Sequence, residues 1–351
     1  MFENPEGSAA RDAEHSQDPP ANPNKARRVR ARKRLKSRRR ELKQFKEKLR
    51  NCGPKDPAEI TRHRHQISRA RAEVFRLERE LLAAERGRAE DEPVTGALPD
   101  FVVLGAQKAG TTYLYNLLVQ HPHIEPAASK ELHFFDNNFE LGVEWYRECF
   151  PAPEWRDGRL TVTGEATPYY LFHPDAARRM AEVVPGARLI VLLRNPVERA
   201  HSHYQMITRK GTELRTFEEA VEAEMGVLRG GMGGVSRREH HVGSEHQLYS
   251  YLSRGVYVDQ LKRWAEVFVR EQMLVLKSED FFERPTETLE IVLGFLGLQG
   301  WASADKEVVV GKRNEGGYES GIDPGTRQRL ETFFGPHNER LYEYLGVDLG
   351  W

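Results

Sequence analysis

The sequence predicts an α/β fold, with a central parallel sheet flanked by helices and a separate α-helical arm before it. Three observations support this prediction. From residue 100 onward, short apolar runs alternate with longer amphipathic stretches, which is typical of a parallel sheet covered on both faces. The first apolar run passes directly into a glycine-containing turn and then into a helical pattern. Residues 25–93 lack such runs and are strongly charged instead.

The apolar runs and amphipathic stretches place the elements of the body. Strands are predicted at residues 101–104, 160–164, 188–193 and 273–277. Helices are predicted over 175–184, 199–208 and 256–268, and a further one begins near Thr111. Ligands of such sheets bind beyond the carboxyl ends of the strands. Functional residues are therefore expected where these strands end.

The charge distribution divides the chain. Formal net charge is zero, yet residues 1–93 hold 25 Lys and Arg against 16 Asp and Glu, while residues 94–351 hold 28 against 37. A basic region thus precedes an acidic body. We predict a disordered segment over 1–24, a basic helical arm over 25–93 and one α/β domain over 94–351.

The arm has a heptad pattern. Leucines recur seven residues apart at 35, 42 and 49, and Ile60, Ile67, Val74 and Leu81 repeat the spacing after a Gly/Pro break. This predicts two helices that form a hairpin or short coiled coil and provide a means of self-association. The basic face could bind nucleic acid or another anionic surface, or could be a solvated spacer. The spacer is favoured, because no aromatic side chains for base stacking interrupt the basic run.

The remaining bulk features predict a cytoplasmic protein. The chain has two cysteines, Cys52 and Cys149, which lie in different regions and do not indicate a disulfide framework. No apolar run approaches the roughly 18–20 residues that span a bilayer. The first 25 residues lack the basic and then apolar order of a signal peptide.

The turn after the first strand is a candidate anion site. Gly105 and Gly110 have the spacing of the two glycines in a Walker A loop, G-x-x-x-x-G-K-[ST]. Thr111 stands where that motif has lysine, and Lys108 lies inside the loop instead. A strand, a glycine loop and a helix in this order direct backbone N–H groups at one anion. The loop is P-loop-like but lacks the lysine position of a nucleotide kinase.

A second candidate anion site follows the strand at 188–193. Arg194 comes directly at its end, Pro196 permits a turn, and Ser202 lies nearly two turns along the next helix. A guanidinium and a hydroxyl so placed can share one phosphate. Taken alone, the motif favours the alternative interpretation, a helix start with a structural salt bridge.

A third motif lies between two predicted strands. Glu131 and His133 stand two residues apart, so in an extended segment both face the same side. A carboxylate beside an imidazole can act as a general base. By itself, a Glu-x-His pair is weak evidence for catalysis.

Together, these motifs resemble the sulfotransferases that use 3′-phosphoadenosine 5′-phosphosulfate (PAPS), in particular the heparan sulfate type and its bacterial relatives. Residues 105–112 (GAQKAGTT) resemble the 5′-phosphosulfate loop of that family, and residues 193–202 resemble its 3′-phosphate motif. Residues 130–136 and 164–169 are similar to its acceptor-side segments, and residues 311–318 to the loop that folds over the nucleotide. The resemblance runs from about residue 100 to the end and implies the sulfotransferase fold.

The resemblance also implies roles for individual residues. Lys108 would neutralise charge on the leaving phosphate oxygen, Glu131 would take the acceptor proton, and His133 would orient Glu131 or the acceptor. PAPS would be the donor and PAP the product, with no metal required. The implied donor-binding residues are Gln107, Lys108, Ala109, Gly110, Thr111, Thr112, Arg194, Ser202, Lys312, Arg313 and Asn314, and the implied acceptor-binding residues are Asp136, Thr167 and Tyr169.

One departure and two alternatives remain. Heparan 3-O-sulfotransferases carry a lysine in Glu-Lys-Thr-Pro, where this chain has Ala166, so a heavily sulfated acceptor is less expected. The acceptor is expected to be a hydroxyl or amine of a glycan, lipid or small molecule. The alternatives are a P-loop-type small-molecule kinase and a non-catalytic scaffold that acts through the basic arm.

A metal site is not expected. Three histidines, His240, His241 and His246, lie close together in the sequence, but no Cys or acidic cluster accompanies them at ligand spacing.

Overall fold

The computed structural model describes residues 23–51, 74, 77, 96–229, 248–298 and 321–351. The chain divides into two compact units, Met1–Glu92 and Pro93–Trp351. Each unit is described by itself. In the described residues, no helix is both long enough and apolar enough to cross a bilayer.

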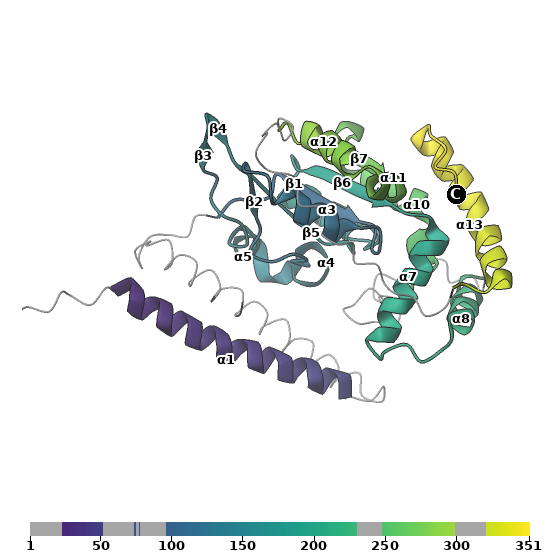
Figure 1. The fold of residues 1–351 in the computed structure, drawn as a ribbon, viewed down its shortest axis with the longest axis horizontal. Helices are drawn as coiled ribbons and strands as arrows, with labels where there is room; N and C mark the ends of the chain where they lie inside the picture. Colours follow the sequence, from purple (N-terminus) through teal and green to yellow (C-terminus); the bar gives the residue numbers. More distant parts are fainter. Residues whose placement is uncertain (1–22, 52–73, 75–76, 78–95, 230–247, 299–320) are drawn as a thin grey trace, which may run out of the picture. The chain divides into compact units, whose positions relative to one another are not determined.

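A parallel sheet forms the centre of the second unit, with strand order β2-β5-β1-β6-β7 (Figure 1). Its strands are β1 (Phe101–Gly105), β2 (Ile124–Pro126), β5 (Val162–Ala166), β6 (Arg188–Leu193) and β7 (Met273–Lys277). A small antiparallel pair, β3 (Trp155–Arg156) and β4 (Arg159–Leu160), lies outside this sheet.

The middle of the sheet is tightly packed. Every residue of β1 is buried, and β1 pairs with β5 on one side and with β6 on the other. Gly164 of β5 is opposite Phe101, and a Cβ there would lie 2.5 Å from the Phe101 carbonyl oxygen. Only glycine permits this approach of the two strands.

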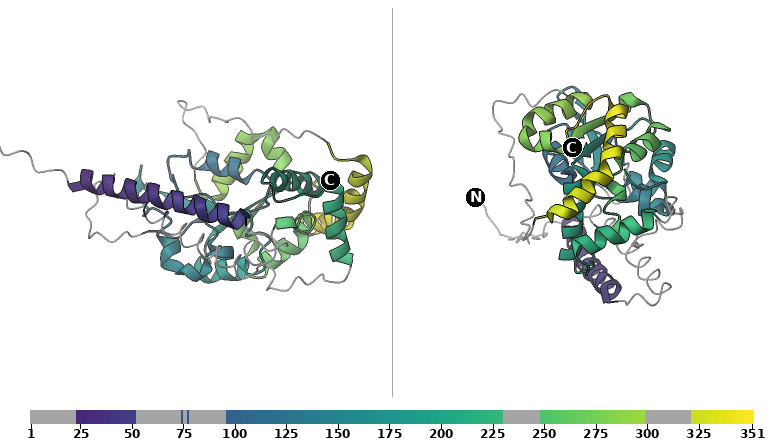
Figure 2. Two further views of the ribbon diagram at one scale, coloured as in Figure 1. Left: turned by 90° about the horizontal axis from the view of Figure 1, so that it is seen from below. Right: turned by 90° about the vertical axis from the view of Figure 1, so that its right-hand side faces the viewer.

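Helices cover both faces of the sheet. In Figure 1, α3, α11 and α12 lie together on the near face; α3 contacts β1 and β5, α11 contacts β7, and α12 contacts both of these helices. Figure 2 shows α13 running beside α7 and α10, which it contacts. The helices of this unit are α3 (Thr111–Leu118), α4 (Phe134–Asn137), α5 (Gly142–Arg147), α6 (Ala176–Val183), α7 (Pro196–Arg209), α8 (Phe217–Arg229), α10 (Tyr257–Ala265), α11 (Ser278–Glu283), α12 (Pro285–Phe295) and α13 (Pro324–Leu345), with 3-10 turns η1 (Phe139–Leu141), η3 (Ser253–Gly255) and η4 (Arg270–Gln272).

The predicted strands and helices agree with the structure except near residue 160. β5 covers Val162–Ala166, two residues later than the prediction, because Thr163 and Glu165 are buried although they are polar. β2 was not predicted, because three residues are too few to show a hydrophobic period. Both differences lie on the side of the sheet nearest the Glu131 motif, since β2 precedes that motif and pairs with β5.

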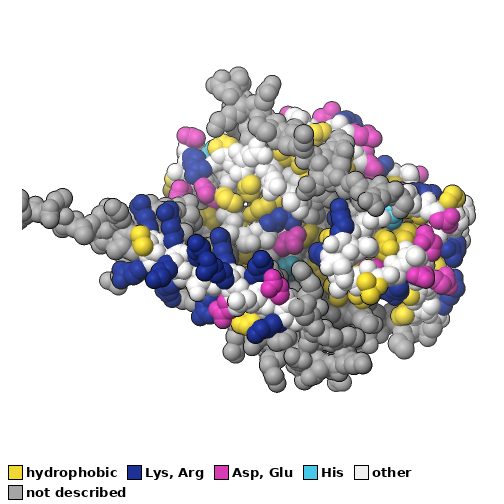
Figure 3. All heavy atoms as spheres, turned by 60° about the horizontal axis from the view of Figure 1, so that its bottom comes forward, with side chains coloured by type: hydrophobic (Ala, Val, Ile, Leu, Met, Phe, Trp, Pro, Cys, Tyr) yellow, Lys and Arg dark blue, Asp and Glu magenta, His cyan; other side chains and the backbone are white. Residues whose placement is uncertain are grey.

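The first unit contains α1 (Pro23–Asn51), which ends where the sequence predicts a break. Leu35 is buried with Val74 and Leu77, and Leu42 packs against this small cluster. Exposed Lys and Arg side chains cover much of the rest of α1, as the space-filling view shows (Figure 3). The arm therefore contains a helix with a basic surface and with two leucines, Leu35 and Leu42, that pack in a small cluster; we call these two residues the leucine pair. A coiled coil is not established.

Candidate functional site

The loop between β1 and α3 holds Lys108 in a specific backbone conformation. Lys108 has φ of 74° and Gly110 has φ of 94°, both in the left-handed region. A Cβ at position 110 would lie 2.8 Å from a ring carbon of Phe282. Glycine is therefore required there for both its conformation and its size.

Neighbouring elements anchor this loop. The N–H of Ala106 donates to the carbonyl oxygen of Leu192 in β6 at 2.7 Å. The hydroxyl of Ser278, at the start of α11, donates to the carbonyl oxygen of Ala109 at 2.6 Å. The loop is thus attached to two different strand-end regions of the sheet.

The start of α3 supplies backbone donors. Thr111 is buried and Thr112 is exposed at the first two positions of the helix. Within the described residues, no side chain caps this end of α3. Uncapped N–H groups at a helix N-terminus, next to a lysine, are suited to bind an anion.

Cations surround Lys108. Burial lowers the pKa of Lys108, and the positive charges of Arg209, Arg194, Lys210 and Arg199 lower it further. A cluster of this kind is electrostatically unfavourable unless negative charge from outside the protein compensates for it. The residues present therefore fit a polyanionic ligand.

The second predicted anion site adjoins the first. Nη1 of Arg194 donates a hydrogen bond of 3.1 Å to the carbonyl oxygen of Lys108. Within the described part of the chain, no carboxylate forms an ion pair with Arg194, so a structural salt bridge does not account for it. Ser202 is buried on α7. Asn195 caps the helix by accepting from the N–H groups of Val197 and Glu198.

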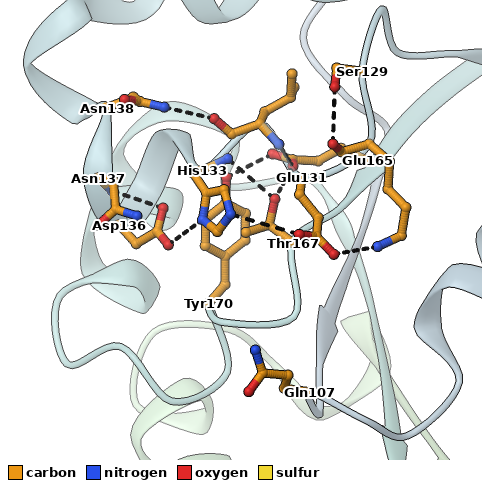
Figure 4. A network of polar contacts seen from close by, with 12 residues as sticks. Gln107, Ser129, Glu131, His133, Asp136, Asn137, Asn138, Glu165, Thr167 and Tyr170 are labelled. Carbon is orange, nitrogen blue, oxygen red and sulfur yellow. Dashed lines mark hydrogen bonds and ion pairs between the residues drawn. The ribbon is translucent and has the colours of Figure 1, made fainter. Parts of the chain in front are cut away.

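The Glu131 motif forms a polar chain rather than an extended segment (Figure 4). Nδ1 of His133 lies 2.7 Å from Oδ2 of buried Asp136, and its Nε2 lies 3.8 Å from Oε2 of Glu131. Nζ of Lys130 forms an ion pair with Glu131 at 2.6 Å. The side chain of Glu131 remains 45% exposed, so it can reach a ligand. Asp136, His133 and Glu131 thus have the order of an orienting acid, an imidazole and an accessible base.

The two predicted acceptor-binding residues after β5 are both buried. The hydroxyl of Thr167 donates to Oε2 of Glu165 at 2.6 Å and accepts from the N–H of His133 at 3.3 Å. The Tyr169 ring lies under the guanidinium of Arg254, 4.6 Å from its centroid, and burial raises the pKa of Tyr169 to about 12. Thr167 thus holds neighbouring groups, and Tyr169 packs against a cation.

Arg254 connects the β1–α3 loop with this region. Its Nη1 donates to Oε1 of Gln107 at 2.6 Å, while Tyr169 and Phe172 pack against its guanidinium. Burial lowers the pKa of Arg254 to about 10. Gln107 lies apart from the Glu131 network in Figure 4. The arginine therefore orients the Gln107 side chain.

Sequence reasoning missed two contributors, Arg254 and Glu165. Arg254 sits in an ordinary charged stretch, and Glu165 was noted only within a motif. No local pattern distinguishes them, because Arg254 contacts Gln107 and Glu165 contacts the Leu132 N–H, and both of these partners are distant in the chain.

Six residues considered in the sequence lie outside the described residues: Lys312, Arg313, Asn314, His240, His241 and His246. Among the described residues, no cluster of His, Cys, Asp and Glu could hold a metal ion.

Comparison with known proteins identifies relatives of this chain. Residues 98–309 match the model of a family described as "Sulfotransferase domain". Human heparan sulfate glucosamine 3-O-sulfotransferase 3B1 is 28% identical over 274 residues, which are 72% of this chain and 65% of that protein. Human heparan sulfate glucosamine 3-O-sulfotransferase 6 is 30% identical over 272 residues, 72% of this chain and 73% of its own length. The chain therefore spans slightly less than two thirds of the first relative.

A solved structure has the same fold. The crystal structure of a sulfotransferase from Alicyclobacillus acidocaldarius is 30% identical in sequence and superposes with a TM-score of 0.54. The match covers 72% of this chain and 98% of that one.

Proposed function

This chain belongs to the sulfotransferase domain family, and we propose that it transfers a sulfuryl group from PAPS to a hydroxyl or amine of a glycan, lipid or small-molecule acceptor. The observation that carries this proposal is the contact between Arg194 and the Lys108 carbonyl. It joins two cationic sites, and PAPS has two separated anionic groups, a 5′-phosphosulfate and a 3′-phosphate. A nucleoside triphosphate would not require the second site.

The donor would bind along the cationic edge of the sheet. Lys108, with the N–H groups at the start of α3 and the hydroxyls of Thr111 and Thr112, would hold the 5′-phosphosulfate. Arg194 and Ser202 would hold the 3′-phosphate. Lys312, Arg313 and Asn314 would close over the nucleotide. PAPS supplies a sulfuryl group bonded to a phosphate oxygen.

Lys108 would stabilise the charge that develops on the departing oxygen. An ammonium group in a partly desolvated site acts more strongly on such charge than one in water. The lowered pKa of Lys108 records that desolvation and the surrounding cations. A bound anion would compensate for both effects and favour the charged form of the lysine.

Glu131 would remove the acceptor proton as general base. Its carboxylate is accessible, and His133 lies between it and Asp136. Asp136 would hold the imidazole with Nδ1–H directed at its carboxylate, so that Nε2 faces Glu131 or the acceptor. General bases positioned in this way contribute about 10²–10⁴-fold to rates.

The acceptor would carry less negative charge than heparan sulfate, which the names of two relatives include. Residues 94–351 hold 37 Asp and Glu against 28 Lys and Arg. Ala166 is fully buried at the end of β5, so no cation extends from that position. A neutral or weakly charged alcohol or amine is the acceptor class that this chain favours.

The experiment is a transfer assay with labelled PAPS and a panel of neutral glycans, lipids, phenols and amines, with heparan sulfate as the anionic comparison. We expect labelled product with a neutral acceptor from the wild type and none from Glu131→Gln, which should bind PAP with wild-type affinity. Wild-type turnover by Glu131→Gln would contradict the assignment of the base. Tighter binding of ATP than of PAPS would contradict the choice of donor.

We also propose that the arm forms a helical hairpin and promotes self-association. The buried cluster of Leu35, Val74 and Leu77 supports this, because it brings the two predicted heptad patterns together. Its role would be association of the chain with its own copies rather than nucleic-acid binding.

A further inference from the structure

Glu165 of β5 is a buried carboxylate that receives donors from the segment carrying Glu131 and His133. It is fully inaccessible to solvent. The N–H of Leu132 donates directly to its Oε2 at 3.4 Å. The next two N–H groups, those of His133 and Phe134, are connected to the same carboxylate, each through one hydroxyl.

The two connecting hydroxyls belong to Thr167 and Tyr170. The N–H of His133 donates to Thr167 Oγ1 at 3.3 Å, and the N–H of Phe134 donates to the Tyr170 hydroxyl at 2.7 Å. These hydroxyls donate in turn to Glu165, at 2.6 Å and 3.0 Å respectively. Three consecutive backbone N–H groups therefore depend on one carboxylate, and Figure 4 shows how His133, Thr167 and Glu165 lie in this network.

The backbone N–H groups can only donate, and this defines the roles of the two connecting hydroxyls. Each connecting hydroxyl accepts one backbone N–H and gives its own proton to Glu165, and the Tyr146 hydroxyl adds a fourth donor at 2.7 Å. A carboxylate that accepts four donors is suited to the ionised form. Burial raises the pKa of Glu165, while the donors from Thr167, Tyr146 and Tyr170 oppose that rise.

The anchored segment has an unusual backbone. Glu131 has φ of 64° and His133 has φ of 54°, in the left-handed region that non-glycine residues rarely occupy. Such conformations persist only where the surroundings impose them, and they occur preferentially at functional sites. The three N–H groups that lead to Glu165 belong to His133 and to the residues on either side of it. Together with the Asn138 side chain, which donates to the Leu132 carbonyl oxygen at 2.9 Å, they restrain this backbone.

We propose that Glu165 is a positioning residue, which acts through Thr167 and Tyr170 to hold the left-handed backbone that directs Glu131 and His133 toward the acceptor. This inference rests on the proposed function of Glu131 as base. It also assigns Thr167 to this anchor. A base displaced by about 1 Å can lose two orders of magnitude in rate.

Two tyrosines give a matched test. Tyr146 and Tyr170 are both fully buried, and each donates one hydrogen bond to Oε1 of Glu165, but only Tyr170 also accepts from the Phe134 N–H. We expect Tyr170→Phe to lower kcat for sulfate transfer about tenfold or more, with the affinity for PAP unchanged. Tyr146→Phe should lower kcat several-fold less, even where the two variants lose similar thermal stability. Equal losses of kcat in the two variants would show a merely structural role and overturn the proposal.

The second connecting hydroxyl provides a rescue. Thr167→Val should lower kcat with little change in the affinity for PAP, and Thr167→Ser, which restores the hydroxyl, should recover most of the rate. Glu165→Gln, which places an amide NH₂ among four donors, should lower kcat at least as much as Tyr170→Phe. Failure of the serine to recover more than the valine would also contradict the proposal.

An observable independent of turnover separates this inference from the proposed function. The imidazole ¹H–¹⁵N signals of His133 report the orientation of the segment. Tyr170→Phe should shift them more than Tyr146→Phe. Unshifted His133 signals in Tyr170→Phe would overturn the positioning role, whereas a wild type without PAPS turnover would overturn the proposed function alone.

Discussion

Nη1 of Arg194 donates a hydrogen bond of 3.1 Å to the backbone carbonyl of Lys108, 86 residues earlier in the chain. The carbonyl of Arg194 in turn accepts from the Tyr257 hydroxyl at 2.8 Å. One arginine at the end of β6 therefore both supplies positive charge and stabilises the loop after β1. The two predicted anion sites are therefore connected by a direct hydrogen bond.

Replacing Arg194 should consequently weaken the binding of both ends of the nucleotide. Hydrogen bonds that involve a charged group contribute about 1.5–3 kcal/mol each, so we expect Arg194→Ala to weaken PAP binding by about 10–100-fold or more. Calorimetric titration with PAP measures the effect. Arg178→Ala removes an exposed α6 ion pair with Glu182 and should leave the affinity unchanged. An unchanged affinity in Arg194→Ala would contradict the second anion site.

Binding of PAP should weaken at alkaline pH because of Lys108. Its pKa is lowered in the free protein, so it loses its proton at a lower pH than an ordinary lysine. An anion prefers the charged lysine, so the dissociation constant should rise as pH passes upward through this lowered pKa. Titrations between about pH 7 and 10 test this expectation. In Lys108→Arg, whose side chain stays charged, the alkaline rise should be smaller; an identical rise would assign it to another group.

Comparison of Gly110→Ala with Gly142→Ala distinguishes the effect of a positive φ from the effect of a steric contact with Phe282. Both glycines have positive φ, 94° and 82°, but only a Cβ at 110 meets a neighbour, Phe282 at 2.8 Å. Each alanine should cost roughly 1–3 kcal/mol of stability, because Gly110 is left-handed and Gly142, with ψ of 161°, lies in a positive-φ region that is essentially restricted to glycine. Only Gly110→Ala should also weaken PAP binding, because the Phe282 ring would have to displace the loop. Thermal unfolding and PAP titration measure the two effects, and equal PAP affinities in both variants would exclude the crowding effect.

The contribution of the leucine pair to the stability of α1 can be tested with alanine variants, which do not lower helix propensity because alanine is the best helix former. Leu35→Ala removes a side chain that is 6% exposed and packs with Val74 and Leu77, whereas Val29→Ala trims one that is 61% exposed. Loss of a buried leucine costs about 2–5 kcal/mol. Hydrogen exchange followed by mass spectrometry should therefore show faster exchange of α1 in Leu35→Ala than in Val29→Ala. Equal exchange rates would mean that the leucine pair does not stabilise α1.

The strands that were best predicted are those with the longest apolar runs. β6 and β7 have the predicted bounds, because each is a continuous apolar run with a single charged residue at one end. β5 was placed two residues early because Glu165, a charged residue, lies inside the sheet. Periodicity assigns such a residue to the surface, and its burial is possible because three hydroxyl groups and the Leu132 N–H donate to its carboxylate.

The order and the chemistry of the motifs follow from the sequence alone. The position of Lys108 in the loop, the spacing of Arg194 and Ser202, and the Glu131, His133 and Asp136 series are all local, and local patterns survive in a linear chain. These motifs indicated the family and the two anion sites. The sequence also predicts the helical character of α1.

The hydrogen bonds between these motifs become visible only in the folded chain. The Arg194 contact with Lys108, the Arg254 contact with Gln107, and the anchoring of His133 by Glu165 through Thr167 join residues separated by dozens of positions. Such contacts depend on how the strand ends come together at one edge of the sheet. The physical reason is that a hydrogen bond requires both partners within about 3 Å, and sequence patterns specify periodicity along an element but not distances between elements.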